Sequence, residues 1–167
     1  KGNDVYKLDQ MAPLNGIEHG DAHNAIGDVI ATAGIAKIIS KKAPSVWKAS
    51  LLTMDKTQSL EVIKKELFFC TNEYFYGKSR PYVETFICQH PQYQWPLCFD
   101  LKHDPNIFLK MPRQELIAAM KKNPKFIRTI RHNKHPIIMH PSYANQFEEY
   151  KEIGEEKLAK RAKLVKE

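Results

Sequence analysis

The stretch from Asn15 to Val29, NGIEHGDAHNAIGDV, places two histidines and three acidic residues directly before an apolar segment. Two of these residues could do chemistry together. A carboxylate such as Asp28 can hold a hard cation such as Mg²⁺, which prefers oxygen ligands. An imidazole such as His23 can take a proton from a metal-bound water because its pKa lies near neutrality. Since this spacing also arises by chance, the alternative is an exposed helix carboxylate beside a capping or packing histidine.

A helix is expected to position this pair. Residues 1–21 contain Gly2, Pro13, Gly16 and Gly20 and are predicted to be loop-like. From about Ala22 to Ile39 the apolar residues recur with helical spacing and small residues are mixed among them, which would let the helix lie close against a sheet. No predicted strand precedes it, so we expect it to be the last element of a domain whose body lies outside this sequence.

The remainder predicts an α+β arrangement. Pro44 makes SKKAPS, residues 40–45, a linker, and aromatic and β-branched runs bounded by turn residues predict strands. KFIRTIRH and HPIIMH are predicted to be two strands with Asn133 and Lys134 at the turn. The final residues, 155–167, predict a charged helix that exposes most of its surface. The other predicted elements are helices at 46–54, 58–66 and 112–123 and strands at 67–71, 82–90 and 96–101.

The composition favours a folded protein and leaves its partner open. With 167 residues and 43% hydrophobic content, the chain can bury a core. Its formal net charge of +7 is compatible with nucleic acid or an acidic peptide as partner, and equally with plain solubility. No apolar run approaches the length of a membrane span, and the first residues lack a signal-peptide pattern, so we expect no membrane association and a cytoplasmic location.

The three cysteines, Cys70, Cys88 and Cys98, form no CxxC pair. An odd number at these spacings argues against a disulfide framework and against a zinc site. Cys88, His90 and Cys98 could be drawn as a metal cluster, but their spacing fits no familiar zinc pattern. We therefore expect buried, reduced thiols.

Basic residues dominate the segment from Lys102 to Lys134, which contains nine lysines and arginines but only two acidic residues, Asp104 and Glu115. One interpretation is a stripe that neutralises phosphates, with aromatic side chains available to stack on bases. The other is a solvated face with scattered charges. Trp95 follows a turn, so it could be either a core anchor or a stacking residue.

The run YKLDQMAPLNGIEHGDAHNAIGDVIATAGIAKII resembles the end of the exonuclease domain of bacterial exonuclease I, a single-strand-specific 3′→5′ DNA exonuclease. The shared order is L-x-x-x-A-P-x-N-G-I-x-H-x-x-A-H-x-A-x-x-D-V, followed by an alanine-rich helix. Further along, CQHPQYQWPLCFDL and IRHNKHPIIMH are similar to strands of the SH3-like domain of that family. The resemblance runs from about Tyr6 to the final helix.

This resemblance implies an RNase H-like nuclease of the DEDDh type, whose carboxylates hold two Mg²⁺ ions. His23 matches the family's general base and Asp28 its last metal-binding carboxylate, while His19 could position the loop or reach the DNA backbone. The family's D-x-E motif is absent from this sequence. We therefore expect a fragment that has no nuclease activity by itself.

The resemblance also implies a domain order and partners. Residues 1–43 would be the end of the RNase H-like exonuclease domain, residues 44–150 an SH3-like β-barrel with inserted and flanking helices, and residues 151–167 a helix leading towards a helical domain. Single-stranded DNA and the acidic tail of single-strand DNA-binding protein would be partners, and the orphan helix could self-associate. The alternative is a non-catalytic module that binds the DNA or the tail. Candidate contacts are Lys64, Lys65, Arg128, Arg131 and Lys134, each of which could instead be a solvated surface cation.

Overall fold

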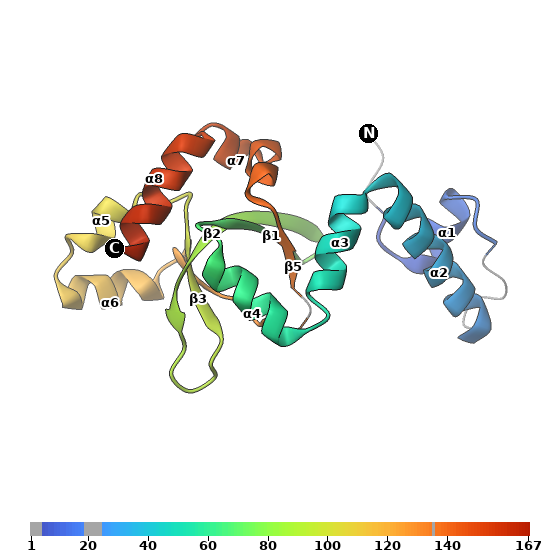
Figure 1. Ribbon diagram of the computed structural model, residues 1–167, viewed down its shortest axis with the longest axis horizontal. Coiled ribbons are helices and arrows are strands. Elements are labelled where there is room, and N and C mark those ends of the chain that lie inside the picture. The colour runs from blue at the N-terminus through green and yellow to red at the C-terminus, as the bar shows by residue number, and fades with distance from the viewer. Residues whose placement is uncertain (1–4, 19–24, 135) are drawn as a thin grey trace. The chain divides into compact units, whose positions relative to one another are not determined.

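The computed structural model describes residues 5–18, 25–134 and 136–167, and divides the chain into two compact units, Lys1–Lys48 and Ala49–Glu167 (Figure 1). Each unit is described by itself. His19 and His23 lie outside the described residues.

The first unit contains two packed helices, α1 (Leu8–Leu14) and α2 (Ala25–Lys42). Helix α1 corrects the expectation of a loop through residue 21. Its Pro13 stands near the end of a short helix, where it removes one backbone donor and does not interrupt a longer run. Helix α2 lies close to the segment that follows α1. A Cβ at Gly34 would lie only 2.8 Å from Cδ1 of Ile17, so glycine permits this close approach.

Helix α2 also exposes apolar side chains. Within this unit Ile26, Val29 and Ile30 are 69%, 66% and 55% exposed, whereas Gly27 and Ala31 are buried. The packed side of α2 is therefore formed by Gly27 and Ala31, and the large apolar residues whose spacing predicts a packed face are exposed instead. Among the described residues, no helix combines the length and apolar character that a bilayer span requires.

The second unit is built on a five-stranded antiparallel sheet in the order β4-β3-β2-β1-β5. Helix α3 (Pro44–Leu52) precedes it, spanning the division between the units. Asp55 then caps α4 (Lys56–Lys65), its carboxylate accepting from the amides of Thr57 and Gln58. The strands are β1 (Phe69–Phe75), β2 (Lys78–Gln89), β3 (Pro96–Asp100), β4 (Ile127–Thr129) and β5 (Ile137–Met139).

Alternation along the strands divides the core between the two faces of the sheet. Phe68 and Cys70 belong to one buried cluster, and Phe69, between them, belongs to the other together with Ile63 of α4. The first cluster also receives α5 (Pro105–Leu109), α6 (Arg113–Lys121), the 3₁₀ turn η1 (Pro141–Gln146), α7 (Glu148–Lys151) and α8 (Glu155–Lys166). Helices thus cover the sheet on both sides.

The strands β4 and β5 differ from the sequence prediction. Both form, but Ile127–Thr129 pairs with β3 and Ile137–Met139 pairs with β1, so they lie at opposite edges of the sheet. After the turn at Asn133 and Lys134 the chain therefore passes from one edge of the sheet to the other.

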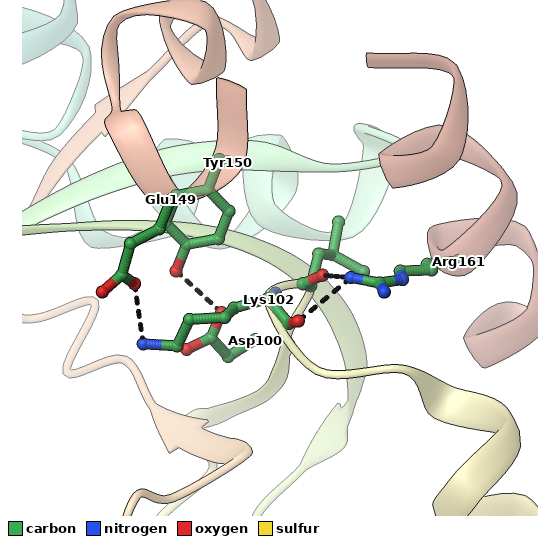
Figure 2. Close-up of polar contacts among 6 residues, drawn as sticks. Asp100, Lys102, Glu149, Tyr150 and Arg161 are labelled. Carbon is green, nitrogen blue, oxygen red and sulfur yellow. Dashed lines mark hydrogen bonds and ion pairs between the residues drawn. The ribbon is translucent and has the colours of Figure 1, made fainter. Parts of the chain in front are cut away.

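The final helix forms where it is predicted and exposes most of its residues, but one of its faces is buried. Leu158 and Ala162 of α8 are fully buried in the core of the second unit. Arg161 donates from Nη1 to the carbonyl oxygens of Leu101 and Lys102, at 2.7 and 3.0 Å. Helix α8 is thus fixed to the end of β3 (Figure 2).

A buried polar contact fixes α7 at the same place. The Tyr150 hydroxyl donates to Oδ1 of Asp100 at 2.7 Å, and both side chains are 1% exposed. Beside them Lys102 forms an ion pair with Glu149 at 2.9 Å (Figure 2). Burial raises the pKa of Tyr150, and the neighbouring Asp100 carboxylate raises it further, so the hydroxyl stays protonated and donates. The end of β3 is therefore held rigidly.

Candidate nucleic-acid interface

A groove crosses the second unit where β1, β4 and β5 meet the β2–β3 loop. Its lining is rich in aromatic and basic side chains. We call it the aromatic groove; it is formed by Thr71, Asn72, Glu73, Tyr74, His90, Tyr93, Trp95, Arg128, Thr129, Ile130, Arg131, Lys134, Pro136 and Ile137.

The β2–β3 loop builds an aromatic stack on one wall of this groove. The rings of Tyr93 and Trp95 are stacked, with centroids 4.8 Å apart and planes 21° from parallel, and His90 lies 4.9 Å from Tyr93. The loop is tightly held: Nδ1 of His90 accepts from the amides of Gln92 and Tyr93, and the His90 amide donates to the Trp95 carbonyl. Tyr93 is nevertheless 52% exposed, so a flat apolar ligand can reach the stack.

Cations border the same stack. The guanidinium carbon of Arg131 lies 5.2 Å from the centroid of the Trp95 ring, within the range of a cation–π contact, and Lys134 is exposed nearby in the lining. Among the described residues that line the groove, Glu73 is the single carboxylate, and it forms an ion pair with Arg128. The charge left over is therefore positive, contributed by Arg131 and Lys134.

Arg128 has a different environment from Arg131. Its guanidinium lies 3.4 Å from the centroid of the Tyr82 ring, pairs with Glu73 of β1, and brings Nε to 3.5 Å from Oε1 of Glu84 on β2. Its side chain is only 18% exposed. Arg128 thus spans from the edge strand β4 to β1 and acts mainly to hold the groove floor together.

Glu84 beneath this arginine is a buried carboxyl group, 1% exposed. Its Oε2 accepts from the Thr71 hydroxyl at 2.5 Å, but its Oε1 has no hydrogen-bond partner. Burial raises the pKa of Glu84 to about 7; the Thr71 hydrogen bond and Arg128 oppose this shift, and Asp100 and Glu73 add to it. Desolvation dominates because the Arg128 contact is an ion pair without a hydrogen bond.

The structure brings together three of the basic residues that the sequence singles out. Arg128, Arg131 and Lys134 line the aromatic groove, whereas Lys64 and Lys65 are exposed on α4 outside its lining. Lys64 donates to Oε1 of Gln89 at 2.8 Å, at the end of β2. Lys64 thus contacts the base of the loop that carries the stack.

The sequence predicts only part of a metal centre in this chain, the pair His23 and Asp28, and the structure describes Asp28 alone of the two. Asp28 is exposed in the first turn of α2, and His23 lies outside the described part of the chain. Over residues 5–18, 25–134 and 136–167, no group of three or more His, Cys, Asp or Glu side chains could hold a metal ion. These residues do not fit a two-ion site, and we derive no catalytic step through one.

The cysteines are free thiols, as expected, but one of them is not buried. Burial raises the pKa of Cys70 to about 12 and that of Cys98 as well, so both remain protonated. Cys88 is exposed, contrary to the prediction. A β-bulge between Phe86 and Cys88 shifts the register of β2 against β3 and interrupts the alternation that would bury Cys88.

The chain is similar to known proteins in both sequence and fold. The chain is 29% identical over 132 residues to exodeoxyribonuclease I of Buchnera aphidicola subsp. Schizaphis graminum, covering 77% of this chain and 25% of that protein. No family model matches the sequence. Exonuclease I of Methylocaldum szegediense superposes with a TM-score of 0.72 at 19% identity, over 96% of this chain and 37% of the other. The chain is similar to part of exonuclease I. The resemblance predicted from the sequence is thereby confirmed.

Other exonuclease I structures share the fold. A complex of E. coli exonuclease I with a dA16 oligonucleotide gives a TM-score of 0.69 at 18% identity, covering 98% of this chain and 38% of the other. An ExoI/SSB-Ct complex gives 0.62 at 19% identity. At these identities the structures establish the mixed helical and antiparallel fold alone. The exonuclease I-like chain spans about a quarter of the length of the Buchnera relative.

The sequence predicts the basic residues of the groove but not the aromatic stack. The predicted site residues do not include Tyr93 and His90. From the sequence alone, Trp95 could be a core anchor or a stacking residue. The signal that is available is HPQYQW, an aromatic pair two residues apart in a loop with turn residues, and the loop backbone with Gln94 at φ +56° brings the two rings together.

Proposed function

We propose that this chain is part of a 3′→5′ exonuclease for single-stranded DNA, and that residues 49–167 bind the DNA strand rather than cut it. The similarity to exodeoxyribonuclease I supports the substrate class. The observation that carries the binding role is the Tyr93–Trp95 stack bordered by Arg131. Stacked aromatic rings and unmatched cations are the features with which proteins hold single strands independently of sequence.

The same proposal assigns a domain to each part of the chain and a role to Asp28 and His23. The five-stranded sheet with its inserted helices would be the SH3-like part, and α1 and α2 the end of an RNase H-like part. Asp28 would then be one of several carboxylates around Mg²⁺, with His23 beside them. Because the described residues supply no complete metal group, we expect no nucleotide release from labelled oligonucleotide by this polypeptide alone, even with Mg²⁺. Sustained release that His23→Ala abolishes would contradict this.

The acidic tail of single-strand DNA-binding protein is proposed as a second partner. The ExoI/SSB-Ct complex among the similar structures supports it, together with the net charge of +7. An acidic peptide and DNA phosphates would both be attracted by Arg131 and Lys134.

Salt dependence tests the electrostatic part of the proposal. If Arg131 and Lys134 each neutralise a phosphate, replacing both by alanine should reduce the slope of log affinity for oligo-dT against log salt by about 1.4. Fluorescence anisotropy between 50 and 200 mM salt measures this slope. The matched control is Lys121→Ala with Lys122→Ala, which removes the same charge outside the groove. Equal slopes for both double variants would remove the groove as the phosphate-binding surface.

A further inference from the structure

The tip of the β1–β2 hairpin carries an unusual exposed aromatic residue. Phe75 pairs with Lys78 in the strand register, so Tyr76 and Gly77 form a two-residue turn. Their φ angles are +50° and +74°, the sign that a type I′ turn requires at both central positions. Asn-Gly is the preferred pair there, because a bulky side chain is strained in the left-handed region.

Tyr76 gains no compensation for this cost by burial. Its side chain is 97% exposed. Backbone strain retained without a packing benefit is typical of a functional site. The side chain at the tip is therefore available for contact with a ligand.

Tyr76 borders a second groove, which adjoins β4. We call it the hairpin groove; its lining includes Tyr76, Arg80, Asp100, Lys125, Arg128 and Thr129. Arg80 and Lys125 are exposed in it. The carboxylate of Asp100 is 1% exposed and engaged by Tyr150, so this groove too offers positive charge to solvent.

The two grooves meet along β4, because Arg128 and Thr129 belong to the lining of both. Arg128 is held there by Glu73 and Tyr82, which makes the junction a fixed floor. A ligand long enough to fill the aromatic groove can therefore continue over β4 into the hairpin groove. Charge complementarity and the exposed ring suit a polyanion with flat apolar groups.

We propose that the hairpin groove is a second subsite for single-stranded DNA, in which an unstacked base lies on the ring of Tyr76 and the adjoining phosphates face Arg80 and Lys125. The inference rests on the proposed function and extends it: the strand bound at Trp95 continues across Arg128 and Thr129 to the hairpin tip. Affinity should then depend on oligonucleotide length in two steps, one for each groove.

The test uses the complete 167-residue chain and two probes, dT4 and dT12. Tyr76→Asn should weaken binding of dT12 about tenfold, the loss of one stacked base, and leave dT4 unchanged. Because asparagine suits the turn, the melting temperature of this variant should equal or exceed that of the original chain. Tyr76→Phe retains the ring and should bind dT12 normally.

Trp95→Ala serves as the reference and should weaken binding of both probes. Unchanged dT12 affinity in Tyr76→Asn, with Trp95→Ala impaired, would overturn the second subsite and leave the proposed function standing. An equal loss of dT4 and dT12 in Tyr76→Asn would also overturn it, since the tip would not be a separate subsite. If the original chain binds neither probe, the proposed function and the subsite fail together.

Discussion

Replacing Trp95 by alanine is expected to weaken binding of dT oligonucleotides by about tenfold to a hundredfold, the loss of one base–aromatic stack. Trp95 supplies the largest ring of the stack and also the surface beneath Arg131. Its removal therefore eliminates a stacking platform and loosens a cation that would face a phosphate. Fluorescence anisotropy with a labelled dT oligonucleotide at fixed, moderate salt measures the change.

Two variants control for this experiment. Trp95→Phe keeps an aromatic face and should lose much less affinity than Trp95→Ala. Tyr93→Ala, which removes the other ring of the stack, should show an intermediate loss. Trp95→Ala that keeps its circular dichroism spectrum and also keeps full affinity would show that the stack does not contact the strand.

Replacing Glu84 by glutamine is expected to raise the free energy of unfolding by about 2 kcal/mol at pH 8, with little change at pH 5. A pKa raised to about 7 in the folded state means that the folded protein holds a proton which the unfolded chain releases near pH 4.5. The stability that Glu84 contributes is therefore complete below about pH 4.5 and is lost as pH rises through 7. Glutamine keeps a hydrogen-bonding group for Thr71 without the buried charge.

Urea unfolding followed at several pH values between 5 and 8 measures this effect. The matched control is Glu61→Gln on the exposed face of α4, which makes the same substitution outside the core. The difference between the two variants isolates the buried group from the remaining titrating residues. A Glu84→Gln profile that runs parallel to the original one across this range would mean that Glu84 is ionised throughout, held so by Arg128.

Local patterns in the sequence predict several of the elements, although not α1, α5 or α7. Helical spacing with small residues predicts α2, and the structure shows why these residues are needed: Gly34 lies against Ile17, and Gly27 is buried. Aromatic and β-branched runs at residues 67–71 and 96–101 predict strands, and alternation along the first of them divides Phe69 and Cys70 between the two cores. These features depend on near neighbours in the chain.

Pairings between distant residues cannot be predicted in this way. The turn at Asn133 and Lys134 predicts two adjacent strands, but the hydrogen bonds of β4 and β5 go to β3 and β1. Cys88 lies at a bulge in the pairing of β2 with β3, and the pattern of β2 alone does not reveal this bulge. Helix α8 is rich in charge, yet its Leu158 and Ala162 match a core surface formed by remote strands.

The candidate site is likewise predictable from the sequence only in part. The resemblance to exonuclease I, together with the basic segment from Lys102 to Lys134, makes Arg128, Arg131 and Lys134 candidate contacts. Their different roles depend on the fold, because Glu73, Tyr82 and Glu84 around Arg128 lie on other strands. Arg131 and Lys134 remain as the cations that a strand could reach.

The most direct test of the DNA-binding role is an NMR titration of the uniformly ¹⁵N-labelled chain with a dT12 oligonucleotide, following the two tryptophan indole signals. Trp95 lies in the aromatic groove, whereas Trp47 belongs to the first unit and serves as an internal reference. The Trp95 indole signal should shift saturably with added oligonucleotide and the Trp47 signal should shift less. Binding that leaves the Trp95 signal in place while Trp47 moves would contradict the assignment of the DNA strand to the aromatic groove.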